Sequence, residues 1–184
     1  MLGQIQPRRA KTYLNIKNGS IVRRTPEGAV ESYSFVDGVA ESISQRDRTF
    51  RGEVVKYWYL DLRDEESGDI YSLGFPYGSN TFKSIILQMA SEKGLEALRN
   101  ASPMKIEPYT QNGYDKVKVW SGGEQLNWAI STLPPIQSRN VGGRVVKDDS
   151  SRMALITDLA HKVREAIISS QETAAPRADL SENW

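Results

Sequence analysis

Two runs of alternating apolar and polar residues lie between Gly52 and Phe75, joined by a polar turn at residues 64–69. In the first run, residues 53–63, one set of alternating positions contains Trp58, Leu60 and Leu62. The other set contains Tyr57, Tyr59, Asp61 and Arg63. Alternation of this kind predicts a strand with one face in a core and the other in water. A second strand is expected over residues 70–75.

The flanking pattern predicts further elements on both sides of this pair. Residues 11–24 read as a hairpin, because Asn18-Gly19 suits a turn in which both residues take positive φ. A long strand is expected over residues 32–46, with Gly38 marking a bulge or bend, followed by a loop at residues 47–51. A helix should begin near Ser79 or Asn80 and bury one face, which carries Phe82, Ile85, Ile86 and Met89.

Two more short strands, residues 104–109 and 114–120, complete the apolar pattern before a last amphipathic helix. The order is a long bent strand, two strands, a helix and two strands. This order predicts a mainly β protein with two helices, built on a five-stranded OB-fold barrel whose helix lies between its third and fourth strands. Small α+β sheets share the order and are the alternative.

The predicted organisation has five parts. These are an N-terminal leader and hairpin (1–31), the barrel (32–131), a linker (132–150) containing Pro134-Pro135 and Gly142-Gly143, a C-terminal helix (151–170) and a flexible acidic tail (171–184). The apolar stripe of the last helix, which includes Met153, Ile156 and Val163, is expected to dock on the barrel or on another chain.

Composition narrows the classes of function. The 184 residues carry a formal net charge of +1, no cysteine and a single histidine, His161. These counts argue against zinc ribbons, thiol nucleophiles and histidine-based acid–base chemistry, so no enzyme activity, metal or cofactor is expected. No apolar run approaches a membrane span and the N-terminus lacks the apolar core of a signal peptide, so a cytoplasmic protein without membrane contact is expected.

The water-facing side of the central strand carries two tyrosines where a charged residue would be ordinary. In an OB-fold barrel this face lies between the loop at residues 46–51 and the loop at residues 109–114, and cations beside exposed rings suit unpaired nucleic acid. The candidate nucleic-acid-binding residues are Arg46, Arg48, Phe50, Arg51, Lys56, Tyr57, Tyr59, Tyr109, Tyr114, Lys116, Lys118 and Trp120. Cross-strand aromatic packing, a solvated arginine turn and lysines that protect a sheet edge are the structural alternatives.

A family resemblance adds to this pattern. Three features carry it: the order of elements between Tyr33 and Trp120, the stretch NGYDKVKVWSGGEQLNW at residues 112–128, and the aromatic-ended acidic tip DLSENW. In these features the chain resembles single-stranded DNA-binding proteins of the tailed-phage type. The resemblance implies that the tail recruits replication, recombination and repair proteins and competes with DNA for a basic cleft. The implied partner-binding residues are Asp179, Leu180, Glu182 and Trp184, although the tip has only two acids and an asparagine near its end.

The expected function is therefore sequence-tolerant binding of single-stranded DNA in phage replication or recombination, within the host cytoplasm if a phage encodes the protein. RNA is an alternative ligand, and a homodimer is compatible with the sequence. The rival classes are a phage structural or assembly protein and a small protein inhibitor, in which the aromatic face would be a protein interface.

Overall fold

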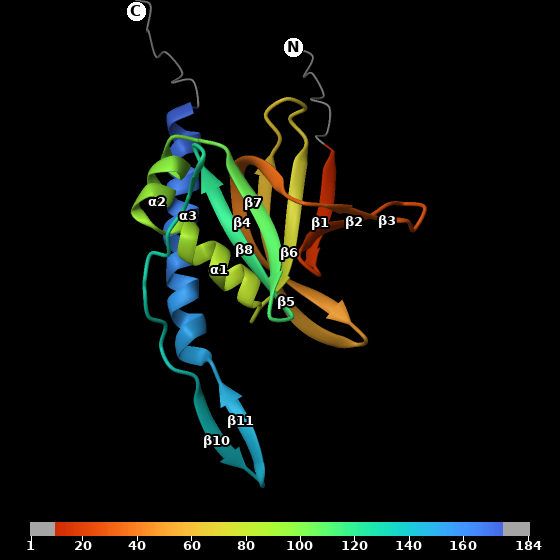
Figure 1. The fold of residues 1–184 in the computed structure, drawn as a ribbon, viewed down its shortest axis with the longest axis vertical. Coiled ribbons are helices and arrows are strands. Elements are labelled where there is room, and N and C mark those ends of the chain that lie inside the picture. The colour runs from red at the N-terminus through yellow and green to blue at the C-terminus, as the bar shows by residue number, and fades with distance from the viewer. Residues whose placement is uncertain (1–9, 175–184) are drawn as a thin grey trace, which may run out of the picture.

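A computed structural model describes residues 10–174 of the chain. Within these residues, nine strands form one mixed sheet in the order β3-β2-β1-β6-β5-β4-β7-β8-β9, and two further strands form a separate hairpin. The helices gather on one side of the sheet, and the separate hairpin projects beyond the start of the last helix (Figure 1). One apolar core joins the sheet to the helices.

Sheet pairing is antiparallel except between β1 and β6, which run parallel. The strands of the main sheet are β1 (Lys11–Lys17), β2 (Ser20–Arg24), β3 (Val30–Tyr33), β4 (Val36–Phe50), β5 (Glu53–Arg63), β6 (Ile70–Pro76), β7 (Met104–Gln111), β8 (Tyr114–Ser121) and β9 (Glu124–Gln125). The β1–β2 and β7–β8 turns are Asn18-Gly19 and Asn112-Gly113, and all four residues have positive φ. The sequence therefore placed these two hairpins correctly.

Three helices are present among the described residues: α1 (Asn80–Met89), α2 (Glu92–Arg99) and α3 (Ser150–Ala174). The Ser79 hydroxyl caps α1 by accepting from the backbone N–H of Phe82. Buried residues of α3, among them Met153, Ile156 and Val163, face α1, α2 and β4. The C-terminal helix thus docks on its own chain. Among residues 10–174, no helix combines the length and the apolar character that a membrane span requires.

The long strand β4 serves two parts of the sheet because it bends near Gly38. Residues Val36 to Gly38 pair with β7, whereas Val39 onward pairs with β5, and the β5 register shifts between Ala40 and Ser42. A Cβ added at Gly38 would lie 2.6 Å from the carbonyl oxygen of Arg63. The bend expected at this glycine is confirmed.

We expect Gly38→Ala to lower the free energy of unfolding by about 1–3 kcal/mol, because the new methyl group must displace backbone rather than a flexible side chain. Urea denaturation followed by circular dichroism measures this change. Gly28→Ala is a matched control, since Gly28 also has positive φ but open space around its Cβ position. An equal loss in both variants would assign the effect to φ alone and contradict the packing explanation.

The predicted five-stranded OB-fold barrel is wrong. Closure would require β6 to pair with β8, but β1 occupies the free edge of β6. The buried side chain of Gln88 in α1 occupies the edge of β8, donating to the Val117 carbonyl at 3.0 Å and accepting from the Val119 N–H at 2.9 Å. Because both edges are already paired, the sheet stays open between β6 and β8.

Three local expectations also need correction. The loop predicted at residues 47–51 is mostly strand: β4 runs to Phe50, and the turn to β5 is Arg51-Gly52 with positive φ at both residues. The range expected as a linker contains the hairpin of β10 (Gln137–Val141) and β11 (Arg144–Asp148). Finally, α2 is a third helix, capped by Ser91, where only two helices were expected.

Candidate nucleic-acid interface

Three tyrosines form a continuous row on the face of the sheet that points away from the apolar core. Tyr13 of β1 meets Tyr59 of β5 edge-to-face with ring centroids 6.4 Å apart, and Tyr57 lies 6.4 Å from Tyr59. Residues at i and i+2 share a strand face, which places Tyr57 and Tyr59 together, and the β1–β6 pairing brings Tyr13 beside them. We call this row of Tyr13, Tyr59 and Tyr57 the tyrosine ladder.

A cation lies over each ring of the tyrosine ladder. The Lys11 ammonium is 5.7 Å from the Tyr13 centroid, the Arg46 guanidinium 5.5 Å from Tyr59, and the Arg48 guanidinium 4.9 Å from Tyr57. Both arginines come from β4, which pairs with β5 along this stretch. Such contacts orient guanidinium groups over aromatic faces and are favourable by about 0.5–2 kcal/mol each.

Asp61, at the β1 end of the tyrosine ladder, anchors this arrangement. Its carboxylate accepts from the Lys11 ammonium at 2.8 Å, from the Ser72 hydroxyl at 2.6 Å and from the Ser42 hydroxyl at 3.1 Å. The aspartate is buried, so these donors compensate for its lost hydration. The network ties β1, β4 and β6 to β5 and holds Lys11 beside Tyr13.

The expectation that Tyr59 and Asp61 face water is wrong, because both side chains are buried. They do lie on the predicted face of the strand, opposite Trp58, Leu60 and Leu62. Tyr59 is only 8% exposed, because Tyr13 and Tyr57 flank its ring. Gly74 of β6 makes room for this ring, since a Cβ there would lie 3.2 Å from the Tyr59 Cε1 atom. The surface for stacking is therefore offered by Tyr13, which is 55% exposed, and by the half-buried Tyr57.

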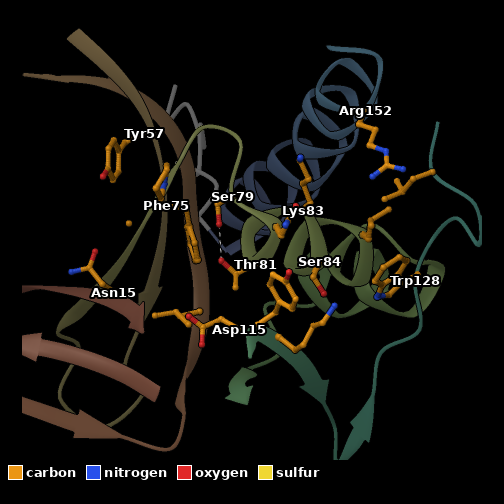
Figure 2. Close-up of a pocket in the computed structure, with 18 residues that line it drawn as sticks. Asn15, Tyr57, Phe75, Ser79, Thr81, Lys83, Ser84, Asp115, Trp128 and Arg152 are labelled. Atoms are coloured by element: carbon orange, nitrogen blue, oxygen red, sulfur yellow. Dashed lines mark hydrogen bonds between the residues drawn. The ribbon is translucent and has the colours of Figure 1, made fainter. Parts of the chain in front are cut away.

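A cleft of about 770 Å³ opens where the sheet fails to close between β6 and β8. Asn15 and Tyr57 line its sheet side, Ser84 of α1 and Trp128 line the opposite side, and Asp115 of β8 lies between them (Figure 2). Tyr114 and Lys116 of β8 also line it. The cleft is thus a direct consequence of the open edges of the sheet.

The charged groups of the cleft differ in how far they are already neutralised. Lys83 is buried and its ammonium lies 2.8 Å from the Asp149 carboxylate, and the Arg152 side chain donates to the Pro134 carbonyl. The Asp115 carboxylate accepts from the backbone N–H of Gly19 at 2.6 Å. Lys116 is exposed and has no carboxylate within 4 Å among residues 10–174, so it remains available for an anionic ligand.

Two smaller depressions adjoin the tyrosine ladder and the cleft. One, of about 350 Å³, is lined by Tyr13, Tyr59, Arg46 and Arg48, and shares Asn15 and Gly74 with the cleft. The other, of about 470 Å³, is lined by Phe50, Lys56 and Tyr77 and shares Tyr57 and Pro76 with the cleft. A ligand longer than one nucleotide could follow these connected surfaces.

The structure brings most of the sequence-predicted residues to this region, but not all. Tyr57 and Tyr59 belong to the tyrosine ladder, and Arg46 and Arg48 lie over their rings. Tyr114 and Lys116 line the cleft. Phe50 and Lys56 line the adjoining depression, with Arg51 5.3 Å from the Phe50 ring. Tyr109, Lys118 and Trp120 line none of these surfaces. Lys118 instead packs over Tyr109 at 5.2 Å, and Lys105 over Trp120 at 5.0 Å.

Several residues of this region were missed by sequence reasoning. Lys11, Tyr13 and Asn15 lie in the N-terminal hairpin, which pairs with β6 from about sixty positions away in the sequence. Their period-two alternation was visible, but nothing local indicates this pairing. Trp128 and Tyr77 lie just outside regular strands, where no periodicity marks their direction.

The proposed partner-binding tip, with Asp179, Leu180, Glu182 and Trp184, lies outside the described residues. Within residues 10–174 no group of three or more metal-ligating side chains comes together. The chain matches no protein-family model, no curated protein and no solved structure. Any functional conclusion therefore depends on the chain's own surface.

Proposed function

We propose that this protein binds single-stranded DNA without sequence preference, along the tyrosine ladder and into the adjoining cleft. The observation that carries the proposal is the pairing of each ladder tyrosine with its own cation on one face of an open sheet. Rings that stack on bases and cations that neutralise phosphates are the two components of sequence-tolerant single-strand binding.

The exposed members of the ladder supply the stacking. Tyr13 and Tyr57 are separated by Tyr59, which holds both rings in place from its buried position. Every base has a π face, and stacking on an aromatic side chain contributes about 1–3 kcal/mol per base. A duplex hides these faces within its own stack, so the tyrosines discriminate in favour of unpaired strands.

The arginines of β4 supply the phosphate contacts. Arg46 and Arg48 are exposed, and neither guanidinium lies within 4 Å of a carboxylate among residues 10–174. Asp47, between them in sequence, also lines the depression that contains both arginines, but it pairs with neither of them. Lys11 is committed to Asp61, so its main contribution is to position Tyr13. Lys116 continues the cationic path inside the cleft.

A protein interface is the second candidate, because tyrosine and arginine are also frequent at interaction hot spots. Recruitment of replication or recombination proteins through the C-terminal tip would be such an additional interaction. Salt dependence separates the two uses of the face. Binding to phosphates weakens steeply as salt rises, whereas an aromatic protein contact changes little.

Fluorescence anisotropy with labelled single-stranded DNA, single-stranded RNA and duplex DNA tests the proposal. We expect the single-stranded DNA to bind at least about tenfold more tightly than the duplex, with affinity falling as salt rises. Equal affinity for duplex, or binding to neither form, would contradict the proposal. Tighter binding of RNA would keep the stacking mechanism and change the assigned ligand.

A further inference from the structure

Tyr77 forms the outer end of a stack of three aromatic rings that reaches into the core. Its ring is 6.3 Å from that of Trp58 with an interplanar angle of 9°, and Trp58 stacks on Phe82 at 4.9 Å and 15°. Trp58 and Phe82 are buried, whereas Tyr77 is partly exposed. The Tyr77 N–H donates to the Lys56 carbonyl at 3.0 Å. The stack and this bond fix the ring as a rigid platform.

This platform lies between two surface depressions. On one side, Tyr77 lines the depression that contains Tyr57 and Phe50, at the end of the tyrosine ladder. On the other side, it lines a depression of about 650 Å³ formed with Arg139 and Lys147 of the β10–β11 hairpin and Met153 of α3. The hairpin extends well beyond the body of the molecule (Figure 1). Tyr77 therefore connects the ladder to the hairpin.

The hairpin carries a charge that suits a polyanion. Residues 137–148 contain three basic side chains and one carboxylate, and the Arg139 side chain is 68% exposed. The two acids of the depression are already engaged. Asp149 pairs with Lys83 at 2.8 Å, and Asp148 accepts from the Ser150 N–H at 3.0 Å and lies 3.6 Å from the Arg139 guanidinium. Arg139 is therefore partly neutralised, whereas Arg144 and Lys147 have no carboxylate within 4 Å among residues 10–174. Hydrogen bonds from the Ser150 side chain and backbone hold the pKa of Asp148 below its usual range.

The hairpin also exposes apolar side chains. Val141, Val145 and Val146 are exposed, and a two-stranded hairpin alone is only marginally stable in water. Exposed valines beside arginine and lysine can contact the faces of bases while the cations contact phosphates. We propose that a bound single strand continues from the tyrosine ladder across Tyr77 onto the β10–β11 hairpin, which extends the binding site; this inference rests on the proposed function.

The test compares oligothymidylates of two lengths, about 6 and about 30 nucleotides, because a short strand bound at the ladder leaves few nucleotides to reach the hairpin and a long strand leaves many. The variant is Arg139→Ala/Lys147→Ala, which removes the two hairpin cations that line the depression. Lys162→Ala/Arg164→Ala is the matched control. It removes the same charge from exposed positions on α3, which lie away from all the surfaces described above.

We expect the hairpin variant to bind the long oligonucleotide about tenfold more weakly, and to bind the short one as the unaltered protein does. The slope of log affinity against log salt should fall by about 1.4 for the long oligonucleotide only. Hydrogen exchange should show that the long oligonucleotide protects the backbone amides of residues 137–148, which would tie the effect to the hairpin itself.

Each remaining outcome overturns the inference. Equal weakening for both lengths would place Arg139 and Lys147 in the primary site rather than in an extension. No weakening, or the same weakening in the Lys162→Ala/Arg164→Ala control, would assign the hairpin to another role such as a protein contact. In either case the unaltered protein still binds the short oligonucleotide, so the proposed function survives. Binding of neither oligonucleotide would refute both.

Discussion

Replacing Tyr13 and Tyr57 together by alanine is expected to weaken single-stranded DNA binding by at least about thirtyfold. Each ring contributes about 1–3 kcal/mol of stacking per base, and the two exposed rings lie on either side of Tyr59. The fold should persist, because neither side chain belongs to the buried core. Anisotropy titration measures the affinity, and a thermal melt of the same variant checks the fold.

Two further variants sharpen this prediction. Tyr13→Phe/Tyr57→Phe keeps the rings and removes only the hydroxyl groups, so it should bind like the unaltered protein. Tyr33→Ala is the matched control, because Tyr33 is also exposed but pairs with Ile21 on the opposite face of the sheet. Unchanged affinity in the double alanine variant would show that the ladder is not the binding surface.

Trp58→Ala is expected to lower the free energy of unfolding by about 3–5 kcal/mol, the largest stability effect that we predict. The ring is 5% exposed and lies between Phe82 and Tyr77, so its removal opens a cavity and breaks the three-ring stack. Trp58→Phe should recover much of this loss, because a smaller ring can still stack. Urea denaturation followed by circular dichroism measures both changes.

The control for this prediction is Trp128→Ala. Trp128 is 49% exposed at the edge of the cleft, so its removal should change the free energy of unfolding by less than about 1 kcal/mol. Similar destabilisation by both alanine variants would mean that the stack around Trp58 does not anchor the core. Tyr77 would then lack the rigid support on which the extended binding path depends.

The sequence predicted local structure well where apolar and polar residues alternate without interruption. Alternation placed Trp58, Leu60 and Leu62 in the core, and all three are buried. It also put Tyr57 and Tyr59 on one face, where the structure adds Arg46 and Arg48 from the neighbouring strand. These features depend on contacts within one strand or across a single hairpin turn, and such contacts are encoded in neighbouring residues.

Features that depend on distant pairing could not be predicted. Nothing near Lys11 or Ile70 indicates that β1 takes the edge of β6. Likewise, Gln88 looks like an ordinary polar residue of an amphipathic helix, yet its amide group occupies the edge of β8. These two pairings keep the sheet open and create the cleft. For the same reason, the burial of Tyr59 by Tyr13 was not visible in the sequence.

Photocrosslinking of an oligothymidylate to the protein, followed by mass spectrometry of the crosslinked peptides, tests the central claim most directly. The account predicts that the crosslinks concentrate at Tyr13 and Tyr57, the exposed rings of the tyrosine ladder. Crosslinks confined to Tyr33 and Tyr71 on the opposite face, or to Tyr109 and Trp120 on β7 and β8, would contradict it.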